Sequence, residues 1–135
     1  MSNTTSTAHD SAADPDQQDI VELVGSWATV PDLVQLWGVS PSRVRGYLAD
    51  REILALRLGP NHALHVPSRF AGATGPLPEL RGTITVLTDG GMDDLAILRW
   101  LFTPEPALPG GGSPMDALES GHRSLVRSQA QLTAW

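Results

Sequence analysis

Two arginines, Arg43 and Arg45, lie close together in the stretch WGVSPSRVRGYL at residues 37–48. Ser40 and Pro41 precede them, and a serine cap followed by proline is typical of the first turn of a helix. The outer arc of the predicted helix holds small or cationic residues: Ser42, Arg43, Arg45 and Gly46. Guanidinium donors match the oxygens of a phosphate group. The segment therefore predicts a helix that presents a cationic surface to a polyanion.

A second short helix is predicted just before the arginine-bearing one. Residues 30–37 carry an apolar stripe that suits one buried helical face. Thr29 or Val30 would cap this helix, and Gly38 would end it in the left-handed conformation. Two short helices joined by a glycine turn are typical of a helix-turn-helix. The residue four before the turn glycine is usually small in that motif, whereas here it is Val34, which would widen the helix crossing.

A β-hairpin is predicted after these two helices. Leucines alternate with other residues over 54–58 and again over 64–66, and residues 59–62 supply the turn. If the leucines face inward, Arg57 and His65 share the exposed face. This pattern is typical of a winged helix-turn-helix. In that motif the second helix enters the major groove of DNA, about 12 Å wide, and the hairpin contacts the DNA backbone. The partner it indicates is double-stranded DNA; the alternative is a generic helical hairpin with solvated arginines.

The sequence contains little that indicates a catalytic or metal-binding site. His62 and His65 have H-x-x-H spacing, but on a hairpin they point to different faces, and no Cys, Asp or Glu lies nearby. The three glycines at 110–112 lack the lysine and the preceding strand of a phosphate loop. Asp93 and Asp94 open an amphipathic helix, where acidic residues interact favourably with the helix dipole. We therefore expect no enzyme, no metal site and no cofactor.

Charge is unevenly distributed along the 135 residues, whose formal net charge is −6. Residues 1–22 hold five acidic residues and no basic one, whereas residues 23–70 hold five arginines against three acids. Local charge matters more than net charge for binding, so the middle segment is the one suited to a polyanion. The sequence shows no cysteine, no secretory signal pattern and no apolar run long enough to span a bilayer. We therefore expect a cytoplasmic, nucleoid-associated protein.

Composition and periodicity divide the chain into four segments. They are a disordered acidic Ser/Thr-rich tail (1–19), a winged helix-turn-helix (20–70), a connector (71–79) and a helical C-terminal domain (80–135). The predicted fold class is mainly α with a small β-hairpin: a winged helix-turn-helix followed by a helical C-terminal module.

Helical spacing of apolar residues supports these segments. Apolar residues from Ile20 to Trp27 fall on one helical face. Residues 80–89 contain β-branched side chains, which favour a strand. The apolar residues of this segment that we expect to be buried are nevertheless spaced as on one face of a helix, so we predict a helix. Residues 92–102 and 122–134 are predicted as two further helices.

Three stretches of the second half resemble a small actinobacterial family of DNA-binding proteins. They are LRGTITVLTDGGMDDLAILRWLFTPEPAL, SPMDAL and VRSQAQ, and the resemblance covers residues 28–135. It is most specific at residues 89–91, 99–104 and 115–118. The family's characterised member is a winged-helix protein that a membrane-bound Ser/Thr kinase phosphorylates. The resemblance therefore implies a winged-helix first half that binds DNA and a helical second half of unclear role.

Tail phosphorylation is a further implication of this resemblance. In that family, phosphorylation of one tail threonine is associated with loss of DNA binding. The resemblance carries this role to Thr4, Thr5 or Thr7, and it does not choose between them because the tails do not align. A phosphate adds about −1.5 to −2 charge, which would compete with DNA phosphate for the arginines. The implied function is a transcriptional or nucleoid-associated regulator, with a Ser/Thr protein kinase as a second partner.

A protein-interaction module is the alternative function. The pattern from Trp100 to Leu118 also resembles, more weakly, the toxin-binding helical domain of certain antitoxins. In that case the C-terminal helices recruit a protein partner and the winged helix is vestigial. An exposed apolar face on residues 92–102 or 122–134 would favour this alternative.

Overall fold

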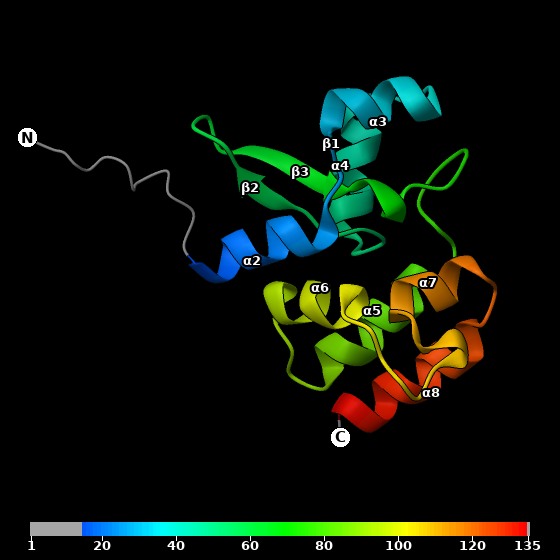
Figure 1. The fold of residues 1–135 in the computed structure, drawn as a ribbon. Coiled ribbons are helices and arrows are strands. Elements are labelled where there is room, and N and C mark those ends of the chain that lie inside the picture. Colours follow the sequence, from blue (N-terminus) through cyan, green and yellow to red (C-terminus); the bar gives the residue numbers. More distant parts are fainter. Residues whose placement is uncertain (1–14, 135) are drawn as a thin grey trace, which may run out of the picture.

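The computed structural model describes residues 15–134, which form seven α-helices and a three-stranded antiparallel sheet (Figure 1). The helices are α2 (Pro15–Val24), α3 (Val30–Trp37), α4 (Pro41–Ala49), α5 (Leu80–Asp89), α6 (Asp94–Phe102), α7 (Pro114–Glu119) and α8 (Arg123–Ala134). The strands are β1 (Trp27–Thr29), β2 (Leu56–Leu58) and β3 (Ala63–Pro67), in the order β1-β3-β2. Two short 3-10 turns are η2 (Ser68–Phe70) and η3 (Pro109–Gly111). The predicted fold class, mainly α with a small β element, is confirmed, and the sheet has one strand more than the predicted hairpin.

Helix α2 begins earlier, and ends earlier, than the sequence predicted. It starts at Pro15, because proline is well tolerated in a first helical turn, so that residues 15–19 of the predicted tail are helical. Gly25, at φ +83°, follows the last helical residue. Trp27 therefore lies in β1, where it pairs with Pro67, and not on the helical face predicted for it.

Local caps define the two helices that were predicted as a helix-turn-helix. The Thr29 side chain accepts a hydrogen bond from the Asp32 backbone N–H at 3.3 Å, and the Asp32 carboxylate accepts one from the Thr29 backbone N–H at 2.9 Å. Gly38 ends α3 in the left-handed conformation, at φ +66°. The Ser40 hydroxyl accepts a hydrogen bond from the Arg43 backbone N–H at 3.1 Å and so caps α4. These contacts confirm both predicted helices and the turn between them.

The register of the sheet separates two residues that were predicted to share a face. β2 pairs with β3 so that Leu56 lies opposite His65 and Arg57 lies opposite Leu64. Directly opposed residues point to the same face of an antiparallel pair, and successive residues alternate between faces. Arg57 and His65 therefore lie on opposite faces, and the predicted common face is wrong. The four-residue turn at 59–62 sets a register one residue away from the one that the leucine pattern suggested.

The C-terminal helices pack against the first half through a shared core. Leu80, Ile84 and Leu87 of α5 are fully buried, which confirms the helix predicted over 80–89. Helix α2 lies between the sheet and α6 (Figure 1). Buried apolar residues of both halves, such as Phe70 and Leu101, belong to one continuous core. Within residues 15–134 no helix has the length and apolar character needed to cross a membrane.

Candidate nucleic-acid interface

The outer surface of α4 has small residues along its middle and an arginine at each edge. Val44 is fully buried, and at 100° per residue Arg43 and Arg45 project on either side of it. Ser42 and Gly46 occupy the arc opposite Val44. Both arginines and Ser42 are exposed, and a Cβ added at Gly46 would meet no atom within 4 Å. The two guanidinium groups therefore mark the two edges of the predicted outer arc, with Ser42 and Gly46 between them.

Tyr47 holds Arg43 at one edge of α4. The Nε of Arg43 donates to the Oη of Tyr47 at 3.2 Å, and the guanidinium carbon lies 5.4 Å from the centroid of the same ring. This hydrogen bond raises the pKa of Arg43 above its usual value. Tyr47 in turn packs edge-on against Trp37, with 5.6 Å between the ring centroids. Sequence reasoning missed Tyr47, although its position four residues after Arg43 places both side chains on one helical face.

Arg45 lies at the other edge of α4, next to the β-hairpin. It lines a hollow of about 370 Å³ together with Arg57, Asn61 and His62. Arg57 is exposed, and its Nη1 donates to the backbone oxygen of His62 at 3.2 Å. Two guanidinium groups beside one hollow suit an anion such as a phosphate. The fold thus brings together two of the arginines that the sequence singled out.

His65 does not join this group. It is half-buried in the central strand β3, on the sheet face opposite to Arg57, and its Nδ1 lies 2.8 Å from the backbone oxygen of Ala63. The pKa of Asp32 is lowered, chiefly by the hydrogen bond from the Thr29 backbone N–H and to a smaller extent by the charge of His65. His65 pairs with Thr29, the cap of α3, across β1 and β3 and so lies beside the start of that helix.

Two further arginines of the basic segment bind acidic residues of the C-terminal helices. The Nη2 of Arg51 lies 2.9 Å from a carboxylate oxygen of Asp94. Arg69 donates to Asp116 at 2.6 Å and also to both carboxylate oxygens of Glu119. The hydrogen bonds to Glu119 are the main reason that the pKa of Arg69 is raised. Of the five arginines in segment 23–70, three are therefore left at the surface around α4.

The threonines predicted as phosphorylation sites lie outside the described residues. Thr4, Thr5 and Thr7 all precede residue 15, where the described chain begins. The start of α2 lies beside the hairpin, because the Nε2 of Gln17 donates to the backbone oxygen of Arg57 at 3.4 Å. The tail therefore joins the described chain close to the hollow that Arg45 and Arg57 line.

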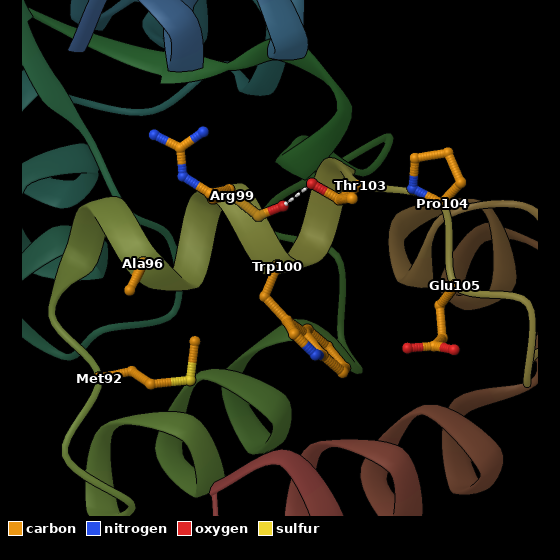
Figure 2. Close-up of a pocket in the computed structure, with 7 residues that line it drawn as sticks. All are labelled: Met92, Ala96, Arg99, Trp100, Thr103, Pro104 and Glu105. Atoms are coloured by element: carbon orange, nitrogen blue, oxygen red, sulfur yellow. Dashed lines mark hydrogen bonds between the residues drawn. The ribbon is translucent and has the colours of Figure 1, made fainter. Parts of the chain in front are cut away.

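A second hollow, of about 400 Å³, runs along α6 (Figure 2). It is lined by Met92, Ala96, Arg99, Trp100, Thr103, Pro104 and Glu105. Figure 2 shows Met92 and Trp100 on one side of α6, whereas the guanidinium group of Arg99 points to the other side. In the described part of the chain, no group of three or more His, Asp or Glu side chains is arranged to hold a metal ion. The lining of this hollow suits an apolar side chain better than a charged ligand.

Comparison with known proteins gives three consistent matches. Residues 77–134 match the model of a family described as the Rv2175c C-terminal domain of unknown function. The chain is 30% identical over 139 residues to the DNA-binding protein Rv2175c of Mycobacterium tuberculosis, and the alignment covers 95% of this chain and 88% of that protein. The NMR structure of Rv2175c matches the fold with a TM-score of 0.71 at 30% identity, over 82% of each chain.

Proposed function

This chain belongs to the family of the DNA-binding protein Rv2175c, and on that premise we propose that it binds double-stranded DNA through α4. The observation that carries the proposal is the position of Arg43 and Arg45 at the two edges of α4, with Ser42 and Gly46 between them. A major groove about 12 Å wide admits one helix. Small central residues let the helix approach the base edges, while arginines at its edges reach the phosphates of the flanking strands.

Arg57 adds a contact with the sugar–phosphate backbone of the DNA beside the groove. Because it shares a hollow with Arg45, the β2–β3 hairpin acts as the wing of a winged helix-turn-helix. His65 faces the other side of the sheet and takes no part in the proposed contact. Three arginine–phosphate contacts correspond to a log–log salt slope of about −2.7, so binding is modest and falls steeply with salt. The protein is then a transcriptional or nucleoid-associated regulator.

Titration of a fluorescent duplex at two salt concentrations tests this proposal. The variant Arg43→Ala/Arg45→Ala removes both edge contacts, and we expect weaker binding and a salt slope that is shallower by about 1.8. Arg99→Ala/Arg127→Ala is the matched control, because it removes two exposed arginines from the C-terminal helices and changes the net charge equally. The control should bind as the parent does. Equal binding by the two double variants would refute the proposal.

Phosphorylation of the tail by a Ser/Thr protein kinase is proposed to weaken this binding. The tail joins α2 beside Arg57, and an extended chain reaches about 3.5 Å per residue, so that a phosphate on Thr7 or Thr4 can reach the arginines. Its charge then competes with DNA phosphate. Glutamate at Thr4, Thr5 or Thr7 should weaken duplex binding at low salt, whereas glutamine at the same position should not. A glutamate variant that binds as tightly as its glutamine counterpart at all three positions would rule this regulation out.

A protein-interaction role of the C-terminal helices is the second candidate. Leu125 and Leu132 of α8 are 48% and 74% exposed, and α6 carries the apolar hollow around Trp100 (Figure 2). Exposed apolar side chains of this kind suit a protein partner. A partner that binds the parent and the Arg43→Ala/Arg45→Ala variant equally, but not a Leu132→Ser variant, would support this role. Unchanged capture by Leu132→Ser would count against it.

A further inference from the structure

The segment between η2 and α5, which the sequence predicted as a connector, is fixed against the helix-turn-helix. The backbone N–H of Gly72 donates to the carbonyl oxygen of Gly75 at 2.7 Å, which closes a tight turn at residues 72–75. Ala71 and Pro76 form an antiparallel bridge at its base. The indole Nε1 of Trp37 donates to the backbone oxygen of Gly72 at 2.9 Å. The 72–75 turn is therefore a closed element held by the last residue of α3.

This turn lies beside the Arg43 edge of α4. A Cβ built on Gly75 would lie 3.7 Å from the Oη of Tyr47, and the same oxygen accepts the hydrogen bond from Arg43. Ala73 and Thr74, at the tip of the turn, are exposed. Figure 1 shows this loop at the same end of the molecule as α3 and α4, away from α8. The turn and the hairpin therefore lie on opposite sides of α4.

Several hydrogen-bond donors around the turn remain available. The Tyr47 hydroxyl accepts from the Nε of Arg43, so its own proton can still be donated. Within residues 15–134, no hydrogen bond engages the Nη atoms of Arg43 or the backbone N–H groups of Ala73 and Thr74. The Thr74 side chain adds an exposed hydroxyl. The guanidinium group of Arg43 and the phenol of Tyr47 thus lie beside a turn with exposed backbone N–H groups, and donors of these three kinds bind phosphate.

We propose that Arg43, Tyr47 and the 72–75 turn form a binding site for a DNA backbone phosphate, on the side of α4 opposite to the hairpin. This inference rests on the proposed function, because it assigns a contact to the second strand that flanks the groove. Tyr47 is a positioning residue in this site: it fixes the direction of the Arg43 guanidinium group while leaving its Nη atoms available. The 72–75 turn of the predicted connector is then part of the DNA-binding surface, and α4 has phosphate-binding groups on both sides.

An added arginine tests whether the turn adjoins DNA. Thr74→Arg places a cation at the exposed tip, and Gln131→Arg adds the same charge to the exposed face of α8 as a matched control. At low salt, Thr74→Arg should tighten duplex binding by about three- to tenfold and steepen the log–log salt slope by about 0.9. Gln131→Arg should change neither quantity. Equal effects of the two variants would overturn the inference.

A double-mutant cycle tests the positioning role of Tyr47. Tyr47→Phe keeps the ring against Trp37 and removes only the hydroxyl, so we expect an unchanged unfolding midpoint and binding weakened by about two- to fivefold. In an Arg43→Ala background the same change should weaken binding less than it does in the parent, because part of its effect acts through Arg43. Additive losses would overturn the positioning role. A parent protein that does not bind duplex DNA overturns both the proposed function and this inference, whereas a binding parent with equal Thr74→Arg and Gln131→Arg variants overturns this inference alone.

Discussion

The Nη2 of Arg51 lies 2.9 Å from the Oδ1 of Asp94, so that the chain just after α4 is tied to the first residue of α6. Arg51 makes this contact from a left-handed backbone conformation, at φ +57°. Arg69 forms a second link of the same kind, to Asp116 and Glu119. These two arginines therefore orient the C-terminal helices relative to the segment that carries α4, and the arginines available to a polyanion are fewer than the sequence predicted.

Two replacements of Arg51 distinguish the stabilisation by its ion pair from the energetic cost of its left-handed backbone conformation. Arg51→Ala loses the pair and keeps the left-handed backbone, so we expect the free energy of unfolding to fall by about 0.5–1 kcal/mol, the size of an exposed ion pair. Arg51→Gly loses the same pair but adopts a positive φ without a Cβ clash, which recovers about 1 kcal/mol. Urea denaturation should rank Arg51→Gly level with the parent and above Arg51→Ala. The reverse order would show that the strain is not significant.

Gly46→Ala should stabilise the fold and impair DNA binding. An alanine Cβ at this position meets no atom within 4 Å, so the variant gains about 0.5–1 kcal/mol from helix propensity. The same methyl group stands at the centre of the α4 surface, and we expect it to weaken duplex binding by about tenfold, the cost of one lost contact. Ser128→Ala on the exposed face of α8 is the control and should leave binding unchanged. Unimpaired binding by Gly46→Ala would place the DNA surface elsewhere.

Ser40→Ala tests the cap that begins α4. The Ser40 hydroxyl accepts a hydrogen bond from the Arg43 backbone N–H at 3.1 Å, and its loss leaves a first-turn donor without that partner. We expect the free energy of unfolding to fall by about 1 kcal/mol. Ser40→Asp keeps an acceptor and should restore most of the loss, which thermal or urea unfolding can measure. A Ser40→Asp variant as unstable as Ser40→Ala would mean that the cap does not explain the effect.

Asp116 should make the stability depend on pH in the acid range. The hydrogen bond from the Ser113 backbone N–H, followed by that from Arg69, lowers the pKa of Asp116 below its usual 3.8. Such a carboxyl stabilises the fold above its unfolded pKa, and this stabilisation is lost as the pH falls through the folded pKa. Asp116→Asn should therefore be less stable than the parent at pH 7, by no more than about 1 kcal/mol because the side chain is 55% exposed. Thermal unfolding should show this difference shrinking in strong acid, and a constant difference would contradict the assignment.

Local patterns in the sequence predicted the helices well, because their causes are local. The caps Thr29 and Ser40 and the left-handed Gly38 act within four residues, so their types and spacing define α3 and α4. The resemblance of the second half to a known family is confirmed at the level of that family by the match to Rv2175c. Strand β1 was not predicted because three residues are too few to show the alternating pattern of a strand. Its pairing residue in β3, Pro67, also lies far along the chain.

The sequence by itself determined which residues form the surface of α4, since a buried Val44 and a helical period of 3.6 place Ser42 and Gly46 outward and an arginine on each side. Only the tertiary structure decided what each arginine meets. Packing of distant segments directs Arg51 and Arg69 to acidic residues of the C-terminal helices and brings the 72–75 turn to Tyr47. The physical reason is that a strand register and a helix contact join residues far apart in the chain, and a shift of one residue in the register turns a side chain to the other face.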